Sequence, residues 1–363
     1  MLDAYLALKA GAFDLDIEVR AGPGITVLFG PSGSGKSMTL RAIAGIERPA
    51  RGRVVIGDVV VFDASAGIDL PPHRRRLGYA GQRPALLPHL SAAKNITFGL
   101  TRVPAAERLG VAARWLERFD LAGFEQRRPA SLSGGQAQRV ALARALAPGH
   151  RVLLLDEPFA ALDETLRQSL RELLARLVRE EGLAILFVTH DLREAHLLAH
   201  ELVVLDRGRV LQAGPRDEVF RKPASRRVAE LLGGVNLLRG VVVERDAGRL
   251  KVDIEGWRAC CDSWAGDPAP GEPVDLVIRP ERVVLRRGEP QELNVLPAVV
   301  VREFDYGTSR TLFFAPEGPG PALSVEVASR PYEVLGIATR KRWLLELPPG
   351  DLHAMPPAEG PRQ

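Results

Sequence analysis

Eight residues near the start of the chain, Gly30-Pro-Ser-Gly-Ser-Gly-Lys-Ser37, fit the spacing G-x-x-x-x-G-K-[ST] at every fixed position. They follow the apolar run Ile25-Thr-Val-Leu-Phe29 and precede residues 38–44, which have helical periodicity. A glycine-rich loop between a strand and a helix turns its N–H groups toward phosphate oxygens, and the helix N-terminus favours negative charge. The spacing therefore predicts a nucleoside triphosphate site.

Each residue type in this loop has a distinct expected role. Gly33 and Gly35 let the backbone curl, Lys36 would reach the β- and γ-phosphate oxygens, and the Ser37 hydroxyl would bind Mg²⁺. A merely flexible Gly/Ser loop is the alternative, but it leaves the Lys-Ser pair in register unexplained. The predicted phosphate-binding residues are Gly30, Pro31, Ser32, Gly33, Ser34, Gly35, Lys36, Ser37 and Met38.

Two adjacent carboxylates, Asp156 and Glu157, end the apolar run Val152-Leu-Leu-Leu155. Beside a nucleotide, Asp156 would enter the Mg²⁺ shell and Glu157 would act as general base toward an attacking water. A solvated acidic turn is the alternative, and the phosphate loop upstream favours the catalytic reading.

A second possible phosphate-binding surface is Leu132-Ser-Gly-Gly-Gln136, which opens a helical pattern that runs through Ala145. One nucleotide does not need two phosphate-binding surfaces from the same chain. The second surface is needed if it contacts the nucleotide that a second chain of a dimer holds. As a bare pattern the stretch could simply be a helix cap, because Ser133 is a good N-cap residue.

Composition narrows the class of protein. With 363 residues, 46% of them hydrophobic and 26% charged, the chain can form two globular domains. The net charge of +4 comes with scattered cations and no long basic tract, so nucleic-acid binding is not expected. The two cysteines, Cys260 and Cys261, are adjacent, which argues against a disulfide framework. The opening residues lack a secretory pattern, and no apolar run reaches a membrane-spanning length, so we expect a cytoplasmic location.

Strands and helices alternate through residues 1–232, which favours an α/β fold with a mostly parallel sheet. Val152–Leu155 and Ala184–Val188 read as buried strands, and Glu164–Glu180 reads as an amphipathic helix. Residues 83–146 show helical periodicity without a convincing strand, so we expect a helical lobe there.

Past Gly233-Gly234 the pattern changes to short alternating strands, which predicts a small antiparallel barrel over residues 235–347. Asn236-Leu-Leu and Asn294-Val-Leu each open a similar strand, a weak internal repeat. Residues 348–363 are rich in Pro and Gly and are expected to form a disordered tail.

Taken together, the motifs resemble those of the ATPase subunit of an ABC transporter. The loop at Gly30 to Ser37 resembles its Walker A motif, Leu132 to Gln136 its signature, and Asp156-Glu157 the end of its Walker B motif. Gln82 stands where the family has its Q-loop glutamine, Ala161-Leu-Asp163 match the D-loop, and His190 matches the switch histidine. The set extends from Gly30 to His190 in the family's order.

The resemblance implies a P-loop ABC ATPase with a RecA-like core, followed by a small OB/TOBE-like regulatory barrel. Two copies of the chain would sandwich two ATP molecules, with ATP and Mg²⁺ bound by one chain and the signature supplied by the other. The implied catalytic residues are Glu157, His190 and Gln82, and the implied metal ligands are Ser37, Gln82 and Asp156. The other implied nucleotide contacts are Ser133, Gly134, Gly135, Gln136 and Asp163.

The family also implies partners: two integral membrane permease subunits, reached through the helical lobe around Leu86 to Phe98, and indirectly a solute-binding protein. It places the chain peripherally at the cytoplasmic face of the membrane. Tyr5 and Phe13 are both possible partners for adenine stacking.

Residues 24–98 look most like the molybdate importers' ATPase, whereas Ile278-Arg-Pro-Glu281 and Tyr306-Gly-Thr-Ser are closer to sulfate, ferric-iron, polyamine and sugar importers. Molybdate or a related oxyanion is therefore the leading substrate, with the other importer classes as alternatives. A soluble ABC ATPase of DNA repair or translation is a second class, but such proteins usually carry two cassettes or a long coiled-coil insertion. A P-loop kinase or GTPase would leave the signature and His190 unexplained.

Overall fold

Buried parallel strands organise the first part of the chain. The computed structural model describes residues 1–160, 162–246, 248–288 and 293–357, and the fold divides into two units, Met1–Arg216 and Asp217–Gln363. In the first unit, every residue of β3 (Gly24–Phe29), β8 (Val152–Asp156) and β9 (Ala184–Thr189) is buried. Such continuous apolar runs are expected of strands that are covered on both faces.

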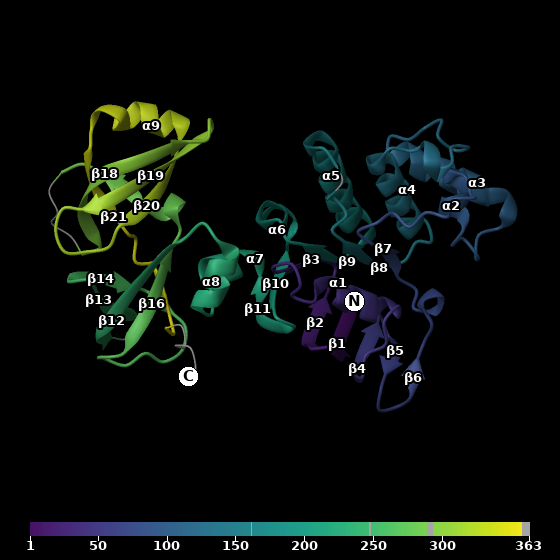
Figure 1. The fold of residues 1–363 in the computed structure, drawn as a ribbon, viewed down its shortest axis with the longest axis horizontal. Helices are drawn as coiled ribbons and strands as arrows, with labels where there is room; N and C mark the ends of the chain where they lie inside the picture. Colours follow the sequence, from purple (N-terminus) through teal and green to yellow (C-terminus); the bar gives the residue numbers. More distant parts are fainter. Residues whose placement is uncertain (161, 247, 289–292, 358–363) are drawn as a thin grey trace. The chain divides into compact units, whose positions relative to one another are not determined.

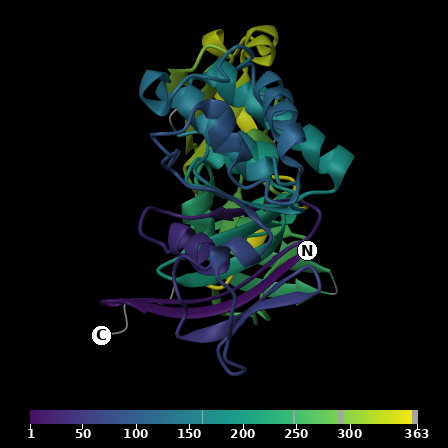
Figure 2. The ribbon, with the colours of Figure 1, turned by 90° about the vertical axis from the view of Figure 1, so that its right-hand side faces the viewer.

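These strands belong to one sheet in the order β6-β5-β4-β1-β2-β11-β10-β3-β9-β8-β7. Strands β10, β3, β9, β8 and β7 run parallel to their neighbours in that order, whereas β1, β2, β4, β5 and β6 pair antiparallel. The sheet is therefore less parallel than the sequence indicated. The remaining bounds are β1 Leu2–Ala10, β2 Phe13–Ala21, β4 Arg51–Ile56, β5 Val59–Asp63, β6 Ile68–Asp69, β7 Gly78–Ala80, β10 Glu201–Asp206 and β11 Arg209–Pro215. Figure 2 shows the long β1–β2 hairpin in purple.

The helices of this unit are α1 Lys36–Ala44, α2 Ala92–Thr97, α3 Ala105–Arg118, α4 Gly134–Leu146, α5 Glu164–Glu181 and α6 Leu192–Leu198, with 3-10 turns at Pro72–Arg74 and Pro129–Ser131. Helices α2, α3 and α4 pack against one another, and α4 contacts β7 (Figure 1). Helix α5 was predicted almost to the residue: Leu170, Leu173, Leu174 and Leu177 form its buried face. Asp163 caps its start, and the left-handed Gly182 ends it.

The second unit contains the expected OB/TOBE-like barrel domain, built from two mainly antiparallel sheets. One sheet has the order β14-β13-β12-β16-β22-β15 and the other β17-β21-β18-β19-β20. All pairs are antiparallel except the short pairing of β15 with β22. The strand bounds are β12 Asn236–Asp246, β13 Arg249–Ile254, β14 Trp257–Cys261, β15 Ser263–Trp264, β16 Pro273–Ile278, β17 Val284–Arg286, β18 Val295–Asp305, β19 Ser309–Pro316, β20 Leu323–Ala328, β21 Arg342–Glu346 and β22 His353–Met355. The helices are α7 Arg216–Arg221, α8 Arg226–Leu232 and α9 Ser329–Leu335, with 3-10 turns at Pro280–Arg282 and Ile337–Thr339.

The internal repeat is confirmed. Strands β12 and β18 are both 11 residues long, and each has a register shift at the equivalent place, after Val242 and after Val300. The Asn236 side chain bonds both the N–H and the C=O of Ser324, at 2.7 and 2.8 Å. The Asn294 side chain does the same with Cys260, at 2.6 and 2.7 Å. Each asparagine thus ties the start of its strand to the other sheet.

Two boundaries differ from the sequence prediction. Gly233 is the C-cap of α8, so the glycine pair at 233–234 marks a helix end. Helix α8 itself packs into the second unit through Ala229, which contacts the cluster of Val277 and Met355. The tail prediction is wrong for residues 348–357, because β22 pairs with β16 and Leu352 and Ala354 are fully buried. Pro and Gly residues on both sides concealed this short strand. Residues 358–363 lie outside the described part of the chain.

Candidate nucleotide site

The loop between β3 and α1 has the backbone that phosphate binding requires. Gly33 and Gly35 have φ of +80° and +105°, a region in which other residues are strained. A Cβ at Gly35 would lie 2.6 Å from Leu15 Cδ1, and one at Gly30 only 2.1 Å from the Leu205 carbonyl oxygen. The glycines of the motif are therefore required by backbone conformation and by close packing.

Lys36 folds back over this loop. Its Nζ donates to the carbonyl oxygens of Gly30 and Pro31 at 2.7 and 2.8 Å, and only 5% of the residue is exposed. Burial lowers the pKa of Lys36, and the negative charges of Glu157 and Asp156 oppose that shift. The Ser34 hydroxyl is buried and has no hydrogen-bond partner among the residues that the structure describes. A buried ammonium and an unpartnered hydroxyl are groups that an anionic ligand in the loop would satisfy.

Asp156 and Ser37 meet at the carboxyl end of β8. The Ser37 hydroxyl donates to Asp156 Oδ1 at 2.8 Å. Burial raises the pKa of Asp156, and the hydrogen bond from Ser37 opposes this. No group of three or more His, Cys, Asp or Glu side chains is placed to hold a metal among the described residues. One carboxylate and one hydroxyl nevertheless fit Mg²⁺, which keeps several waters and takes phosphate oxygens as ligands.

Glu157 lies between two other predicted site residues. Its Oε1 is 2.9 Å from His190 Nδ1, and its Oε2 accepts from Gln82 Nε2 at 3.2 Å. The three side chains follow the carboxyl ends of β8, β9 and β7, which are parallel neighbours in the sheet. Glu157 also has a left-handed φ of +46°, a strained conformation for a non-glycine residue, of the kind found at functional sites.

These groups line one cleft of about 470 Å³. Its lining residues are Phe13, Ser32, Gly33, Gly35, Lys36, Ser37, Met38, Arg41, Gln82, Glu157 and His190. Phe13 is thus at the phosphate loop, whereas Tyr5 lines a different depression on the antiparallel strands. The sequence analysis did not assign Arg41, although its position one helical turn after Ser37 was a usable signal.

The predicted signature residues lie outside this cleft. Ser133 and Gln136 form a capping box at the start of α4: the Ser133 hydroxyl accepts from Gln136 N–H, and Gln136 Oε1 accepts from Ser133 N–H at 3.0 Å. The helix-cap alternative therefore describes the contacts that Ser133 makes. Gly134 has open space around its Cα, and Gly135 faces Leu162 and Leu166. None of these residues lines the cleft that contains Lys36 and Glu157.

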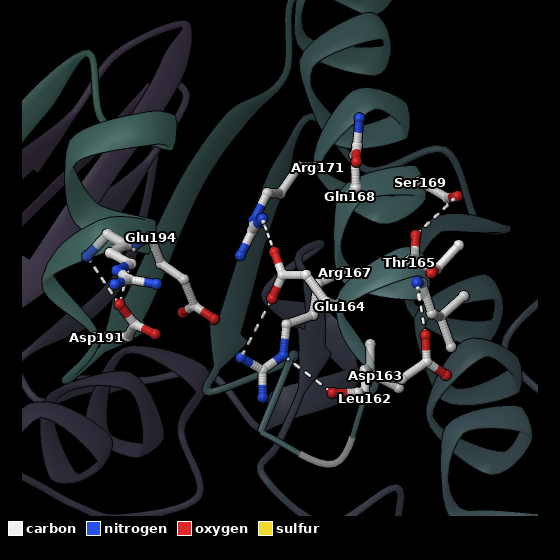
Figure 3. Close-up of polar contacts among 12 residues, drawn as sticks. Leu162, Asp163, Glu164, Thr165, Arg167, Gln168, Ser169, Arg171, Asp191 and Glu194 are labelled. Carbon is white, nitrogen blue, oxygen red and sulfur yellow. Dashed lines mark hydrogen bonds and ion pairs between the residues drawn. The ribbon is translucent and has the colours of Figure 1, made fainter. Parts of the chain in front are cut away.

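The segment after Glu157 is held by α5. Asp163 Oδ1 accepts from Leu166 N–H at 2.9 Å, and Arg167 Nε donates to the Leu162 carbonyl at 3.0 Å. Figure 3 shows Arg167 and Arg171 both reaching Glu164, at 3.9 and 2.9 Å. The predicted D-loop residue Ala161 lies outside the described residues. Arg167 was missed by the sequence analysis, because nothing in its spacing marks a bond to a loop carbonyl.

Known proteins show the same architecture. Residues 13–160 match the family model described as "ABC transporter". The chain is 38% identical over 312 residues to a molybdenum import ATP-binding protein of Paramagnetospirillum magneticum, covering 83% of this chain and 84% of the relative. The chain belongs to the ABC transporter ATP-binding proteins.

Two further comparisons bear on this family assignment. A spermidine/putrescine import ATP-binding protein of Rubrobacter xylanophilus is 38% identical, with 89% of each chain covered. The solved dimeric structure of an ATP-binding cassette in a post-hydrolysis state, bound to ADP and phosphate, is 29% identical with a TM-score of 0.53. It covers 60% of this chain and 99% of that structure. ATP binding and ATP hydrolysis coupled to transport are therefore established at the level of the family. None of the helices in the described residues is long and apolar enough to span a bilayer.

Proposed function

We propose that this chain hydrolyses ATP in the cleft beside the phosphate loop, with Glu157 as general base. The observation that carries the proposal is Glu157 itself, held between Gln82 and His190 at the ends of three parallel strands. A carboxylate that is oriented from both oxygens is positioned to take a proton from water that attacks the γ-phosphate. His190 orients Glu157 and contacts the γ-phosphate, and Gln82 reports nucleotide binding to the neighbouring lobe.

Lys36 and the backbone amides of residues 30–38 bind the β- and γ-phosphates. Lys36 exchanges its two carbonyl contacts for phosphate oxygens when ATP enters. Mg²⁺ would be held by Ser37, Asp156 and Gln82, and it would neutralise charge on the phosphates. Phe13 stacks on the adenine, because it lines this cleft and Tyr5 does not.

The active form is a homodimer that closes over two ATP molecules. Ser133, Gly134, Gly135 and Gln136 stand at a helix N-terminus outside their own chain's cleft, so they are available to the partner's γ-phosphate. Asp163 would approach the same interface, because it is exposed at the start of α5. ATP drives closure because it binds the closed dimer better than the open one. The dimeric solved relative supports this arrangement.

Residues 83–146 form the lobe that contacts the permease, and residues 86–98 follow Gln82 directly. Phe98 is 66% exposed, which is unusual for a phenylalanine and suits a contact with another protein. The chain works at the cytoplasmic face of the membrane, on two permease subunits that receive solute from a binding protein. The first unit carries the catalysis, and the barrel domain of the second unit, including β22, regulates it.

The transported solute is molybdate or a related oxyanion. A relative named for molybdenum import supports this, together with the likeness of residues 24–98 to that class. Spermidine/putrescine import is the alternative, since a relative so named is equally identical over more of the chain. Reconstitution with a cognate permease, followed by ATP-dependent uptake of molybdate, sulfate, ferric iron and spermidine into vesicles, decides between them. Uptake of spermidine alone would overturn the oxyanion proposal.

A further inference from the structure

A second cleft in the first unit, of about 900 Å³, lies at the opposite strand ends from the nucleotide site. Arg76 stands shortly before β7 and Arg151 immediately before β8, and these two strands are parallel. Gln82 and Glu157 follow the other ends of the same strands. The remaining walls come from the β4–β5 turn at Gly57-Asp58 and from residues 99–103. The cleft is therefore separate from the residues that the proposed ATP chemistry uses.

The lining of this cleft is strongly basic. Asp58 is its one acidic residue among the described lining residues, whereas its basic residues are His73, Arg74, Arg75, Arg76, Arg102, His150 and Arg151. The side chains of Arg74, Arg76, Arg102 and Arg151 make no ion pair or hydrogen bond within the described chain. Other arginines of this unit do form ion pairs, as Arg41 does with Glu47. Several unpaired guanidinium groups around one hollow create a positive potential that an anion would neutralise.

The backbone that carries two of these arginines is fixed. Arg75, between Arg74 and Arg76, is only 1% exposed. Its guanidinium donates to the carbonyl oxygens of Leu70, Ala42 and Ile43 and to Asp69, at 2.8 to 3.0 Å. Arg76 follows with a left-handed φ of +52°. The neighbours of an anchored residue start from defined positions, which reduces the entropy lost when they bind a ligand.

The positive charges of the cleft also act on His150. Burial lowers its pKa, and the positive charges of Arg102 and Arg76 lower it further. The imidazole is thus biased toward its neutral form, which can still donate one hydrogen bond to a ligand oxygen. Thr101 adds a hydroxyl to the same lining.

We propose that this cleft binds a multivalent phosphate-type anion. Planar guanidinium groups bind phosphate oxygens in pairs, and four unpaired arginines match a ligand with two or more phosphate groups. The cleft volume lies in the range of small-molecule sites. A free polyphosphate and the headgroup of an anionic phospholipid share this chemistry. Because Arg75 also holds the last carbonyls of α1, the bound anion would sit next to the anchor of the phosphate-loop helix.

Calorimetric titration of the full chain carrying Lys36→Ala with inorganic tripolyphosphate tests the proposal, because loss of Lys36 weakens anion binding by the phosphate loop and leaves the cleft open. The variants below are made in the same background. The cleft variant is Arg76→Gln/Arg102→Gln. The matched control is Arg176→Gln/Arg179→Gln on α5, where both residues are exposed and the same charge is lost. We expect the cleft variant to weaken tripolyphosphate binding by about tenfold or more and the control by no more than about twofold.

Flotation with phosphatidylcholine vesicles, with and without cardiolipin, whose headgroup carries two phosphates, separates the two sources. If the cleft variant loses binding to acidic vesicles but keeps tripolyphosphate binding, the ligand is a lipid headgroup. If it loses tripolyphosphate binding but keeps vesicle binding, the ligand is a free anion. Equal weakening by cleft and control variants, or unchanged binding in the cleft variant, would overturn the site. Melting curves check folding, and a second variant, Arg102→Gln/Arg151→Gln, repeats the test without touching the segment around Arg75.

Discussion

His190 Nδ1 lies 2.9 Å from Glu157 Oε1, although 33 residues separate the two in the chain. The parallel pairing of β8 with β9 produces this proximity, since both side chains follow the same end of the sheet. The other carboxylate oxygen of Glu157 accepts a hydrogen bond from Gln82, which follows β7. Two protein contacts therefore orient the proposed catalytic carboxylate, which lowers the reorganisation needed during hydrolysis.

Replacing Glu157 by Gln should abolish turnover while ATP binding persists. The amide keeps the shape of the side chain and loses the base, so the hydrolysis rate should fall by roughly 10²- to 10⁴-fold. Removal of a negative charge near the γ-phosphate should also let ATP-bound dimers accumulate, visible by gel filtration. Glu180→Gln, an exposed change on α5, is the control. Near-normal hydrolysis by Glu157→Gln would refute the assignment.

Arg167 is a positioning residue for the segment that precedes α5. Arg167→Ala removes the bond from Nε to the Leu162 carbonyl, so the loop that carries Asp163 loses its anchor. We expect kcat to fall by about tenfold while KM for ATP stays nearly constant, because Arg167 does not line the nucleotide cleft. Arg176→Ala is the control on the same helix. A rise in KM with kcat intact would contradict this role.

Stability of the barrel should decrease in mild acid because of His353. This residue is 4% exposed, and burial lowers its pKa to about 4 from the usual 6.5. The unfolded state therefore binds more protons between these two values. Stability is full above pH 6.5 and falls as pH drops toward 4, by up to about 3 kcal/mol. Urea unfolding followed by tryptophan fluorescence at several pH values measures this stability, since Trp257, Trp264 and Trp343 lie in the second unit.

His353→Gln supplies the comparison for that measurement. The amide can replace the contact between His353 Nδ1 and Ser263 Oγ, which is 2.8 Å long, but it does not titrate. The free energy of unfolding of His353→Gln should change less between pH 6.5 and 4 than that of the natural chain. An identical pH dependence in the two proteins would exclude His353 as the cause.

Removal of the barrel should leave ATP hydrolysis within a few-fold of the full chain. All predicted catalytic residues lie before Arg216, where the first unit ends. A chain that ends at Leu232 retains α8 without its partners Val277 and Met355, so it should be less soluble than one that ends at Arg216. ATPase assays and melting curves of both truncations test this. A folded truncation without hydrolysis would show that the barrel contributes to catalysis.

Much of the nucleotide site could be predicted from sequence, because its motifs are local. The segment from Gly30 to Ser37 encodes a strand, a turn and a helix start within a few residues, and the apolar run before Asp156 marks a strand end without reference to the rest of the chain. The set of motifs then assigned Gln82 and His190, which single positions could not do.

What failed depended on distant pairing. Strands β1 and β2 form a local hairpin, but its sequence does not state that β1 also pairs with β4 and β2 with β11, which adds the hairpin to the sheet. Strand β22 is only three residues long, and its burial comes from β16, far earlier in the chain. The bond from Arg167 to Leu162 likewise depends on how the loop before α5 folds back onto the helix.

The most direct test of a shared active site is complementation between two inactive chains. Ser133→Arg blocks the signature, and Lys36→Ala disables the phosphate loop. In a mixed dimer, the intact phosphate loop of one chain meets the intact signature of the other. Each variant alone should be inactive, and an equal mixture should recover about a quarter of the normal ATPase rate, since half the dimers are mixed and each has one complete site. No recovery on mixing, or loss of the Ser133→Arg chain's own nucleotide affinity, would contradict the account.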